Sequence, residues 1–373
     1  MQTFAQSWLI YDLTGSKLYL GVVSAVSTLP LLLFSLPCGA LADRFSKRKI
    51  ALITQSLSMV QALVLAVLVY MDIIQVWHIV ALSAFSGLVN AFDAPARQAM
   101  VSELVEKEDL LNAVALNSSA FNGARILGPA IAGVIYAAMG AGTCFLVNGT
   151  SFIAVLISLF VIHPRVVLPE SNGDSMLAQI KEGLSCSRKN LLIRDLLLLT
   201  AIASIFGLNY STQMPAYAKD ILRVGPEGMG LLMAAAGVGA LTAAISVAGL
   251  GHLFKRGVLV IAGSILTPVG LIALSFSNSY FLSIAWVVFI GFGMMLFLAV
   301  SNSVIQYTSP DELRGRILSL RAVVFGGLAP IGTMQIAVLA QYLGVRSAIF
   351  IGGSIWLLAS IYFVICSRSI RNA

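Results

Sequence analysis

Residues 257–310 read GVLVIAGSILTPVGLIALSFSNSYFLSIAWVVFIGFGMMLFLAVSNSVIQYTSP, without one charged side chain. A hydrocarbon core about 30 Å thick is crossed by roughly 20 helical residues, so this run is long enough for two crossings. The polar stretch Ser275–Tyr280 divides it into two apolar segments. Backbone polar groups in lipid must be paired within the segment itself, as they are in a helix. The run therefore predicts two consecutive transmembrane helices.

The composition of the whole chain extends this conclusion. Of the 373 residues, 58% are hydrophobic and 10% are charged, whereas about 25% of the residues of an ordinary soluble domain are charged. So few charges cannot cover a soluble surface, which excludes a water-soluble enzyme. Counting such apolar runs predicts 11 complete transmembrane helices in an all-α integral membrane protein. In this count a small-residue break at Gly140–Gly142 divides the stretch from Leu110 to Pro164 into two spans. The runs are too long, and do not alternate in polarity, for the strands of a closed β-barrel.

Basic residues alternate along the connectors between the apolar runs. One set of alternate connectors carries 17 of the 23 Lys and Arg residues, and the opposite set carries 4. Cytoplasmic loops of membrane proteins are enriched in Lys and Arg, so the first set, with the C-terminal end, is predicted to be cytoplasmic. The net charge of +7 is therefore attributed to membrane orientation, and no nucleic-acid partner is expected.

Patterns typical of catalytic or metal-binding proteins are missing from the sequence. The four cysteines, Cys38, Cys144, Cys186 and Cys366, stand apart without a CxxC spacing, so neither a disulfide framework nor a metal site is predicted. Neither a phosphate-binding loop nor a nucleophile–base pair is found. We therefore expect no enzyme activity and no cofactor.

The two halves of the chain resemble each other. Leucine, phenylalanine and glycine recur with one spacing in 116–128 and in 320–332, an offset of 204 residues, and Asp12 corresponds to Asp220 at an offset of 208. Parallel repeats of this kind are typical of one class of secondary transporter. We predict an N-terminal helix bundle at 1–163, a cytoplasmic linker at 164–194 and a C-terminal helix bundle at 195–373.

The repeat also predicts an incomplete first helix. Subtracting about 208 from Asp195, near which the corresponding later helix starts, places the start of the first helix roughly 13 residues before Met1. Residues 1–13 are then the remnant of this helix. Either the true reading frame starts upstream of Met1 or the chain is a truncated product. In the linker, apolar residues from Met176 to Leu184 recur at helical spacing beside cations. They indicate a short helix on the inner membrane surface, although a solvated linker explains them nearly as well.

A short basic run joins two of the predicted spans: Gly39-Ala-Leu-Ala-Asp43-Arg44-Phe-Ser-Lys47-Arg48. Its glycine permits close helix approach, its aspartate can cap a helix N-terminus, and its cations can reach neighbouring carboxylates. The run resembles the signature cytoplasmic loop of the major facilitator superfamily. The resemblance implies a bundle of six plus six helices and a latch that holds one state of the transport cycle, formed by Gly39, Asp43, Arg44, Lys47 and Arg48.

Asp93 and Arg97 are four residues apart and so share a helix face near the cytoplasmic end. Pro95 between them favours a kink. The family pattern implies that Asp93 engages the cationic loop around Lys47 and Arg48. For this pair we favour a gating network over a proton-carrying site.

A second motif reads Asn122-Gly-Ala-Arg125-Ile-Leu-Gly128-Pro129-Ala-Ile-Ala-Gly133. Its proline removes a backbone donor and its glycines permit tight packing, so the helix can bend at a cavity. The motif resembles the fifth-helix motif of antiporters in the same superfamily, with Ala132 where that motif has glycine. The resemblance implies proton-coupled antiport. Ordinary packing of small residues is the alternative.

A longer series of short matches covers nearly the whole chain. It is similar to the transmembrane secretion effector branch, which includes exporters similar to the enterobactin exporter. The resemblance implies a monomeric exporter of a small molecule in the bacterial inner membrane, driven by protons. The matching segments include Asp93-Ala-Pro-Ala-Arg97-Gln98, Leu111-Asn112-Ala113, Leu116-Asn117-Ser118 and Arg314-Gly315-Arg316.

Two arginines lie within predicted spans. Arg125 follows Asn112 by 13 residues, about 20 Å along a helix and so near mid-membrane. A charge is costly there and marks a candidate functional site. We expect Arg125 to contact an anionic or polar substrate or a carboxylate, and an arginine satisfied by backbone carbonyls is the alternative. Arg321 lies early in its span and is expected to snorkel to the inner surface.

Neutral polar residues within the spans are candidates for lining a cavity, although a single residue of this kind more often forms a hydrogen bond between helices. The leading hypothesis is a secondary exporter of a siderophore-like metabolite or a drug that works by alternating access. The alternatives are a transporter-like sensor or scaffold without transport, and an inactive truncated fragment. The coupling carboxylate is open, with Asp12 and Asp93 as candidates. The candidate cavity residues are Asn122, Asn209, Gln213, Asn302 and Gln306.

Overall fold

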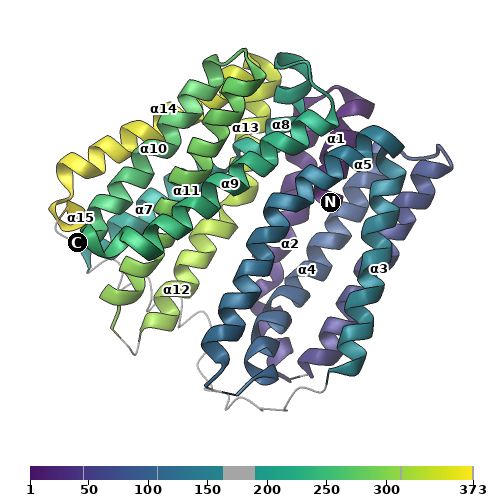
Figure 1. Ribbon diagram of the computed structural model, residues 1–373, viewed down its shortest axis with the longest axis horizontal. Helices are drawn as coiled ribbons and strands as arrows, with labels where there is room; N and C mark the ends of the chain where they lie inside the picture. The colour runs from purple at the N-terminus through teal and green to yellow at the C-terminus, as the bar shows by residue number, and fades with distance from the viewer. Residues whose placement is uncertain (45, 107, 163–189, 311–312, 372–373) are drawn as a thin grey trace. The chain divides into compact units, whose positions relative to one another are not determined.

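The computed structural model of the protein describes residues 1–44, 46–106, 108–162, 190–310 and 313–371. All regular elements within these ranges are helices (Figure 1). Ten helical stretches are long and apolar enough to cross a membrane. The chain divides into two compact units. Unit 1 comprises Met1–Gly15 and Val22–Gly173, and unit 2 comprises Ser16–Gly21 and Asp174–Ala373. The predicted surface helix of the linker lies outside the described residues.

Unit 1 contains the first helices of the chain. Inside it, α3 packs against α4 and α5, and α1 packs against α4 and α5. Amide side chains join three of these helices: Gln2 Nε2 donates to Gln61 Oε1 at 2.7 Å, and Asn148 Nδ2 donates to Gln2 Oε1 at 3.0 Å. Such bonds hold helices together in apolar surroundings. The bounds are α1 (Gln2–Thr14), α2 (Lys17–Arg44), α3 (Lys47–Tyr70), α4 (Val76–Leu104) and α5 (Leu110–Val161).

The long element α5 consists of two helical arms that meet at Gly140. There φ is 80° and ψ is 179°, a conformation that glycine adopts and residues with a Cβ rarely do. The Cys144 thiol lies 3.5 Å from the carbonyl oxygen of Ala132, although twelve residues of straight helix would separate them by about 18 Å. The chain therefore turns back on itself, which confirms the break predicted at Gly140–Gly142. The total of 11 complete transmembrane helices stays a prediction.

Unit 2 contains the remaining helices, several of them interrupted. The stretch 257–310 forms α10 and α11, and the chain leaves the helical conformation between them within the polar stretch Ser275–Tyr280, as predicted. In sequence order the elements are α7 (Leu191–Phe206), η1 (Leu208–Gln213), α8 (Met214–Ala216), η2 (Tyr217–Ile221), α9 (Pro226–Leu250), η3 (Gly251–Leu253), α10 (Arg256–Phe276), α11 (Tyr280–Thr308), α12 (Arg314–Ala322), η4 (Val323–Gly327), α13 (Ala329–Leu343), α14 (Val345–Cys366) and α15 (Arg368–Arg371).

The backbones of α9 and α11 touch. A Cβ placed on Gly239 would clash with the carbonyl oxygen of Val288, and a Cβ on Gly291 would clash with that of Ala236. Lipid tails are as apolar as leucine, so helices in a membrane gain little from the hydrophobic effect when they associate. Close van der Waals packing through glycines is what holds this pair together.

The first residues of α2 pack inside unit 2. Gln341 Oε1, on α13, accepts hydrogen bonds from the backbone N–H groups of Lys17 at 3.0 Å and Leu18 at 3.3 Å. The first N–H groups of a helix have no partner within the helix, and here a distant side chain supplies one. Lys17 Nζ also lies 3.5 Å from Asp220 Oδ2. The start of α2 is thus fixed by residues far from it in sequence.

Candidate functional site

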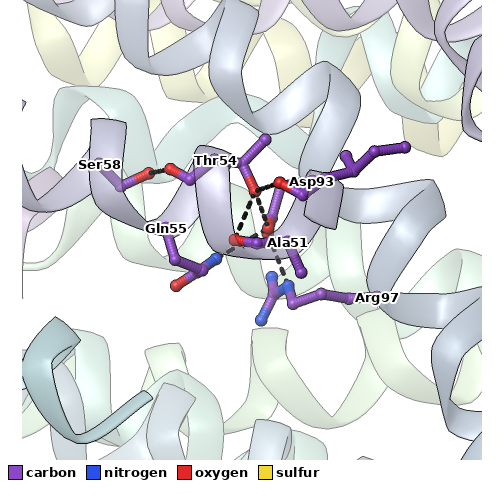
Figure 2. Close-up of polar contacts among 7 residues, drawn as sticks. Ala51, Thr54, Gln55, Ser58, Asp93 and Arg97 are labelled. Carbon is purple, nitrogen blue, oxygen red and sulfur yellow. Dashed lines mark hydrogen bonds and ion pairs between the residues drawn. The ribbon is translucent and has the colours of Figure 1, made fainter. Parts of the chain in front are cut away.

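A buried carboxylate joins α3 and α4 (Figure 2). Asp93, on α4, is 3% exposed. Its Oδ1 accepts hydrogen bonds from Thr54 Oγ1 at 2.7 Å and from Gln55 Nε2 at 2.8 Å, both on α3. Its Oδ2 lies 2.6 Å from Arg97 Nε, one turn further along α4. Hydrogen bonds to a charged group are stronger than neutral ones, and three of them satisfy this carboxylate.

The position of Asp93 follows from its helix. Residues four apart share a helix face, so Arg97 reaches the carboxylate from the same helix. The helix α4 continues through Pro95 without interruption. Burial of an unpaired carboxylate costs several kcal/mol, whereas a carboxylate with several donors is tolerated. The cluster is therefore an internal connection between α3 and α4.

Arg48 makes other contacts than those expected from the family pattern. Its Nε donates to the carbonyl oxygen of Leu159 at 2.7 Å and its Nη2 to that of Phe160 at 2.6 Å. Both carbonyls belong to the last turn of α5, where no backbone donor is available, and a cation is favourable there. The expectation that Arg48 pairs with Asp93 is therefore not what the structure shows: Arg48 caps α5, and Arg97 pairs with Asp93.

The rest of the basic run lies at the junction of α2 and α3. Lys47 is the first residue of α3. Gly39, Asp43 and Arg44 belong to the last turns of α2, and their side chains lie outside the described part of the structure. The latch implied by the family resemblance thus stays a prediction.

The second motif lies on the first arm of α5. Arg125 is exposed, and it makes no hydrogen bond or ion pair within the described ranges. Gly133 is buried, and the helix runs through Pro129 without a break. A Cβ on Gly128 would meet no atom within 4 Å. Close packing therefore does not explain this glycine, and the turn of the chain occurs at Gly140 instead.

Arg321 reaches α11 within unit 2, and its expected snorkelling to the inner surface stays a prediction. Its Nη2 donates to the carbonyl oxygen of Leu298 at 2.9 Å and lies 3.5 Å from Ser301 Oγ, both on α11. Leu298 lies ten residues before the end of α11 at Thr308, about 15 Å along the helix. The guanidinium is thus held well inside the span.

Of the predicted cavity residues in unit 2, two form internal hydrogen bonds. Asn209 Nδ2 donates to the carbonyl oxygen of Ser204 at 2.5 Å where α7 ends. Gln213 is fully buried and its Nε2 donates to the carbonyl oxygen of Lys17 at 3.3 Å. Asn302 is half-buried and Gln306 is exposed. Asn122, in unit 1, is half-buried and engaged in a polar interaction.

Sequence reasoning missed the polar partners of these groups. Thr54 and Gln55, with Ser56 after them, form a polar stretch in a largely apolar part of α3, and that stretch was the available signal. Ser301 and Gln341 carry no such signal, because their roles depend on which helices are neighbours. Among the described residues no group of three or more His, Cys, Asp or Glu side chains is placed to hold a metal ion.

Comparison with known proteins adds three findings. The family described as transmembrane secretion effector matches residues 1–371. The chain is 25% identical to the staphyloferrin A transporter of Staphylococcus aureus, over 98% of this chain and 91% of the relative, and 26% identical to the multidrug efflux pump Tap of Mycolicibacterium fortuitum, over 91% and 85%. The fold resembles a crystal structure of the nucleoside transporter NupG, with a TM-score of 0.81 at 8% identity, covering 98% of this chain and 95% of that one.

Proposed function

Since the chain belongs to the transmembrane secretion effector family of major facilitator transporters, we propose that it exports a small organic molecule across the bacterial cell membrane by alternating access, coupled to protons. The relatives named above are a siderophore transporter and a drug efflux pump. They support export of a siderophore-like metabolite or a drug. The distribution of basic connectors supports a cytoplasmic C-terminus.

The observation that carries the proposal is Arg125. It is exposed on a helix that the sequence assigns to the membrane, and no carbonyl or carboxylate in the described ranges compensates its charge. An arginine facing lipid would be costly, so the side chain faces water or a ligand. Its guanidinium has five donors in a planar fork that suits carboxylates and other oxyanions. We assign Arg125 as a contact for an anionic or polar group of the exported molecule.

The Asp93 cluster serves another purpose in this proposal. Its carboxylate already accepts from Thr54, Gln55 and Arg97, so no further ligand is needed. These bonds join α3 to α4, close to the basic run that the family resemblance describes as a latch. We assign Asp93 and Arg97 to gating, and we propose Asp12 as the carboxylate that carries the proton. Asp12 is hydrogen-bonded to Tyr136 on α5.

The test compares cells that express the chain, cells that express Arg125→Ala, and cells with an empty vector. Siderophore secretion and drug accumulation are measured together, with and without a protonophore. The expected result is export that requires the proton gradient and falls at least about tenfold with Arg125→Ala, a loss of about 1.4 kcal/mol of transition-state stabilisation. Arg125→Lys keeps the charge and is the matched control. A membrane-inserted chain that changes neither readout would favour the sensor or scaffold alternative.

A further inference from the structure

Unit 2 holds a second arginine whose charge is uncompensated. Arg321 Nη2 donates to Leu298 O and approaches Ser301 Oγ, and both acceptors are neutral. Arg321 takes part in none of the ion pairs Lys17–Asp220, Arg97–Asp93 and Arg194–Asp195, and no other ion pair of Arg321 with a described residue is found. An arginine cannot lose its proton in a protein. A permanent positive charge therefore lies in the span, and within the described ranges no carboxylate forms an ion pair with it.

The guanidinium is held on one side and open on another. Its Nε is buried and has no hydrogen-bond partner. Its Nη1 makes no hydrogen bond with a described residue and is not among the enclosed atoms. Anchored through Nη2 to the backbone of α11, the group cannot turn away freely. It presents donors in a fixed orientation, as a recognition site for a planar anion requires.

The neighbouring turn of α11 supplies further polar groups. Ser301, fully buried, follows Leu298 by three residues and donates its hydroxyl to Leu298 O at 3.2 Å, so it helps to hold the guanidinium and is not itself a donor for a ligand. Asn302 follows Leu298 by four residues. Residues three and four apart share a helix face, so Asn302 lies on the side of α11 that Arg321 contacts. Its side chain is half-buried and has no hydrogen-bond partner among the described residues. A neutral amide beside a guanidinium adds a donor for an anion without adding a competing negative charge.

We infer that Arg321 and Asn302 form an anion-binding subsite in unit 2, with Ser301 holding the guanidinium in place, and that this subsite takes a carboxylate, or a comparable oxyanion, of the transported molecule. The role in transport rests on the proposed function, whereas the subsite itself does not. Arg321 thereby acts as a second, independent determinant of specificity for anionic substrates. A purely structural arginine, which only ties α12 to α11, is the competing explanation that the experiment must exclude.

The subsite is tested with charged thiol reagents. Asn302→Cys is introduced into a chain whose four native cysteines are replaced, and the purified protein in nanodiscs reacts with an anionic and a cationic methanethiosulfonate of similar size. A positive charge about 7 Å away favours the anionic reagent by about five- to tenfold in aqueous surroundings. We expect this preference, and we expect Arg321→Gln in the same background to abolish it while Arg321→Lys retains it.

Arg346→Gln is the matched control. Arg346 also has a buried Nε without a partner and an Nη2 bonded to Ser277 O and Asn278 Oδ1, but it lies at the start of α14. Its loss should leave the reagent preference unchanged. If Arg321→Gln fails to fold, raising the ionic strength to about 1 M, where the Debye length is about 3 Å, must reduce the preference in the parent. An unreactive thiol, or a preference that persists in Arg321→Gln, would overturn the subsite.

Efflux of two dyes from the same cells separates the subsite from the proposed function. We expect Arg321→Gln to slow export of anionic carboxyfluorescein at least fivefold, or about 1 kcal/mol at 1.4 kcal/mol per tenfold, and export of cationic ethidium less than twofold. If the unsubstituted chain exports neither dye, the proposed function fails for these probes and the labelling result alone decides the subsite. Equal slowing of both dyes would contradict a role in recognising anions.

Discussion

Asp93 and Arg125 are both charged residues on helices assigned to the membrane, but their surroundings differ completely. The carboxylate of Asp93 is enclosed and accepts three hydrogen bonds from Thr54, Gln55 and Arg97. The guanidinium of Arg125 is exposed and makes no bond within the described ranges. A charge that the protein satisfies itself holds helices together. A charge left unsatisfied in a span is costly to keep unless it acts on a ligand.

The first prediction concerns the satisfied charge. Asp93→Ala would leave the buried Gln55 Nε2 without an acceptor, which costs about 1 to 3 kcal/mol. Thr54 would lose its charge-assisted bond, worth about 1 kcal/mol more, and keep only the carbonyl oxygens of Ile50 and Ala51 as acceptors. We expect the free energy of unfolding to fall by about 3 kcal/mol, seen as a lower thermal midpoint in detergent. Asp93→Asn keeps an acceptor oxygen and is the matched control, with a smaller loss. An Asp93→Ala protein as stable as its parent would show that the cluster does not join α3 to α4.

A second prediction concerns Arg48, which is satisfied by backbone carbonyls. Arg48→Ala removes two charge-assisted bonds from the last turn of α5, and we expect a loss of about 1 to 2 kcal/mol. Lys49→Ala, at an exposed neighbouring position, is the control and should change stability by less than about 0.5 kcal/mol. Equal stability of the two variants in thermal unfolding would contradict the capping role.

The third prediction concerns Arg97, whose substitution is expected to cause the smallest loss of stability. The Arg97 side chain is 54% exposed, and solvent screens its ion pair with Asp93. We expect Arg97→Ala to cost about 0.2 to 1 kcal/mol. Gln98→Ala, next to it and also exposed, serves as the control. A loss as large as that of Asp93→Ala would place the ion pair, and not the bonds to α3, at the centre of the cluster.

Much of the fold could be predicted from the sequence, because each crossing of a lipid bilayer requires a helix of about 20 mostly apolar residues. The charge-free run 257–310 gave two helices divided within Ser275–Tyr280, and the small residues after 139 marked the turn at Gly140. Both depend on local composition alone. The whole-chain resemblance indicated the family that the comparison found.

The partners of the candidate site residues could not be predicted in the same way. Whether Arg48 reaches Asp93 or the end of α5 depends on how α3 is rotated against its neighbours, which sequence spacing does not determine. The direction of Arg321 depends on the acceptor oxygens of Leu298 and Ser301 on α11. Long, flexible side chains choose among partners that tertiary packing supplies, so their roles emerge only with the structure.

The contrast between satisfied and unsatisfied charges is tested most directly by measuring export and the amount of folded protein on the same membranes for Arg125→Ala. The account predicts a free energy of unfolding within about 0.5 kcal/mol of that of the parent, the range typical of surface substitutions. It also predicts that export falls at least tenfold. Export at the parental rate would contradict it. So would a loss of export that only follows a loss of folded protein.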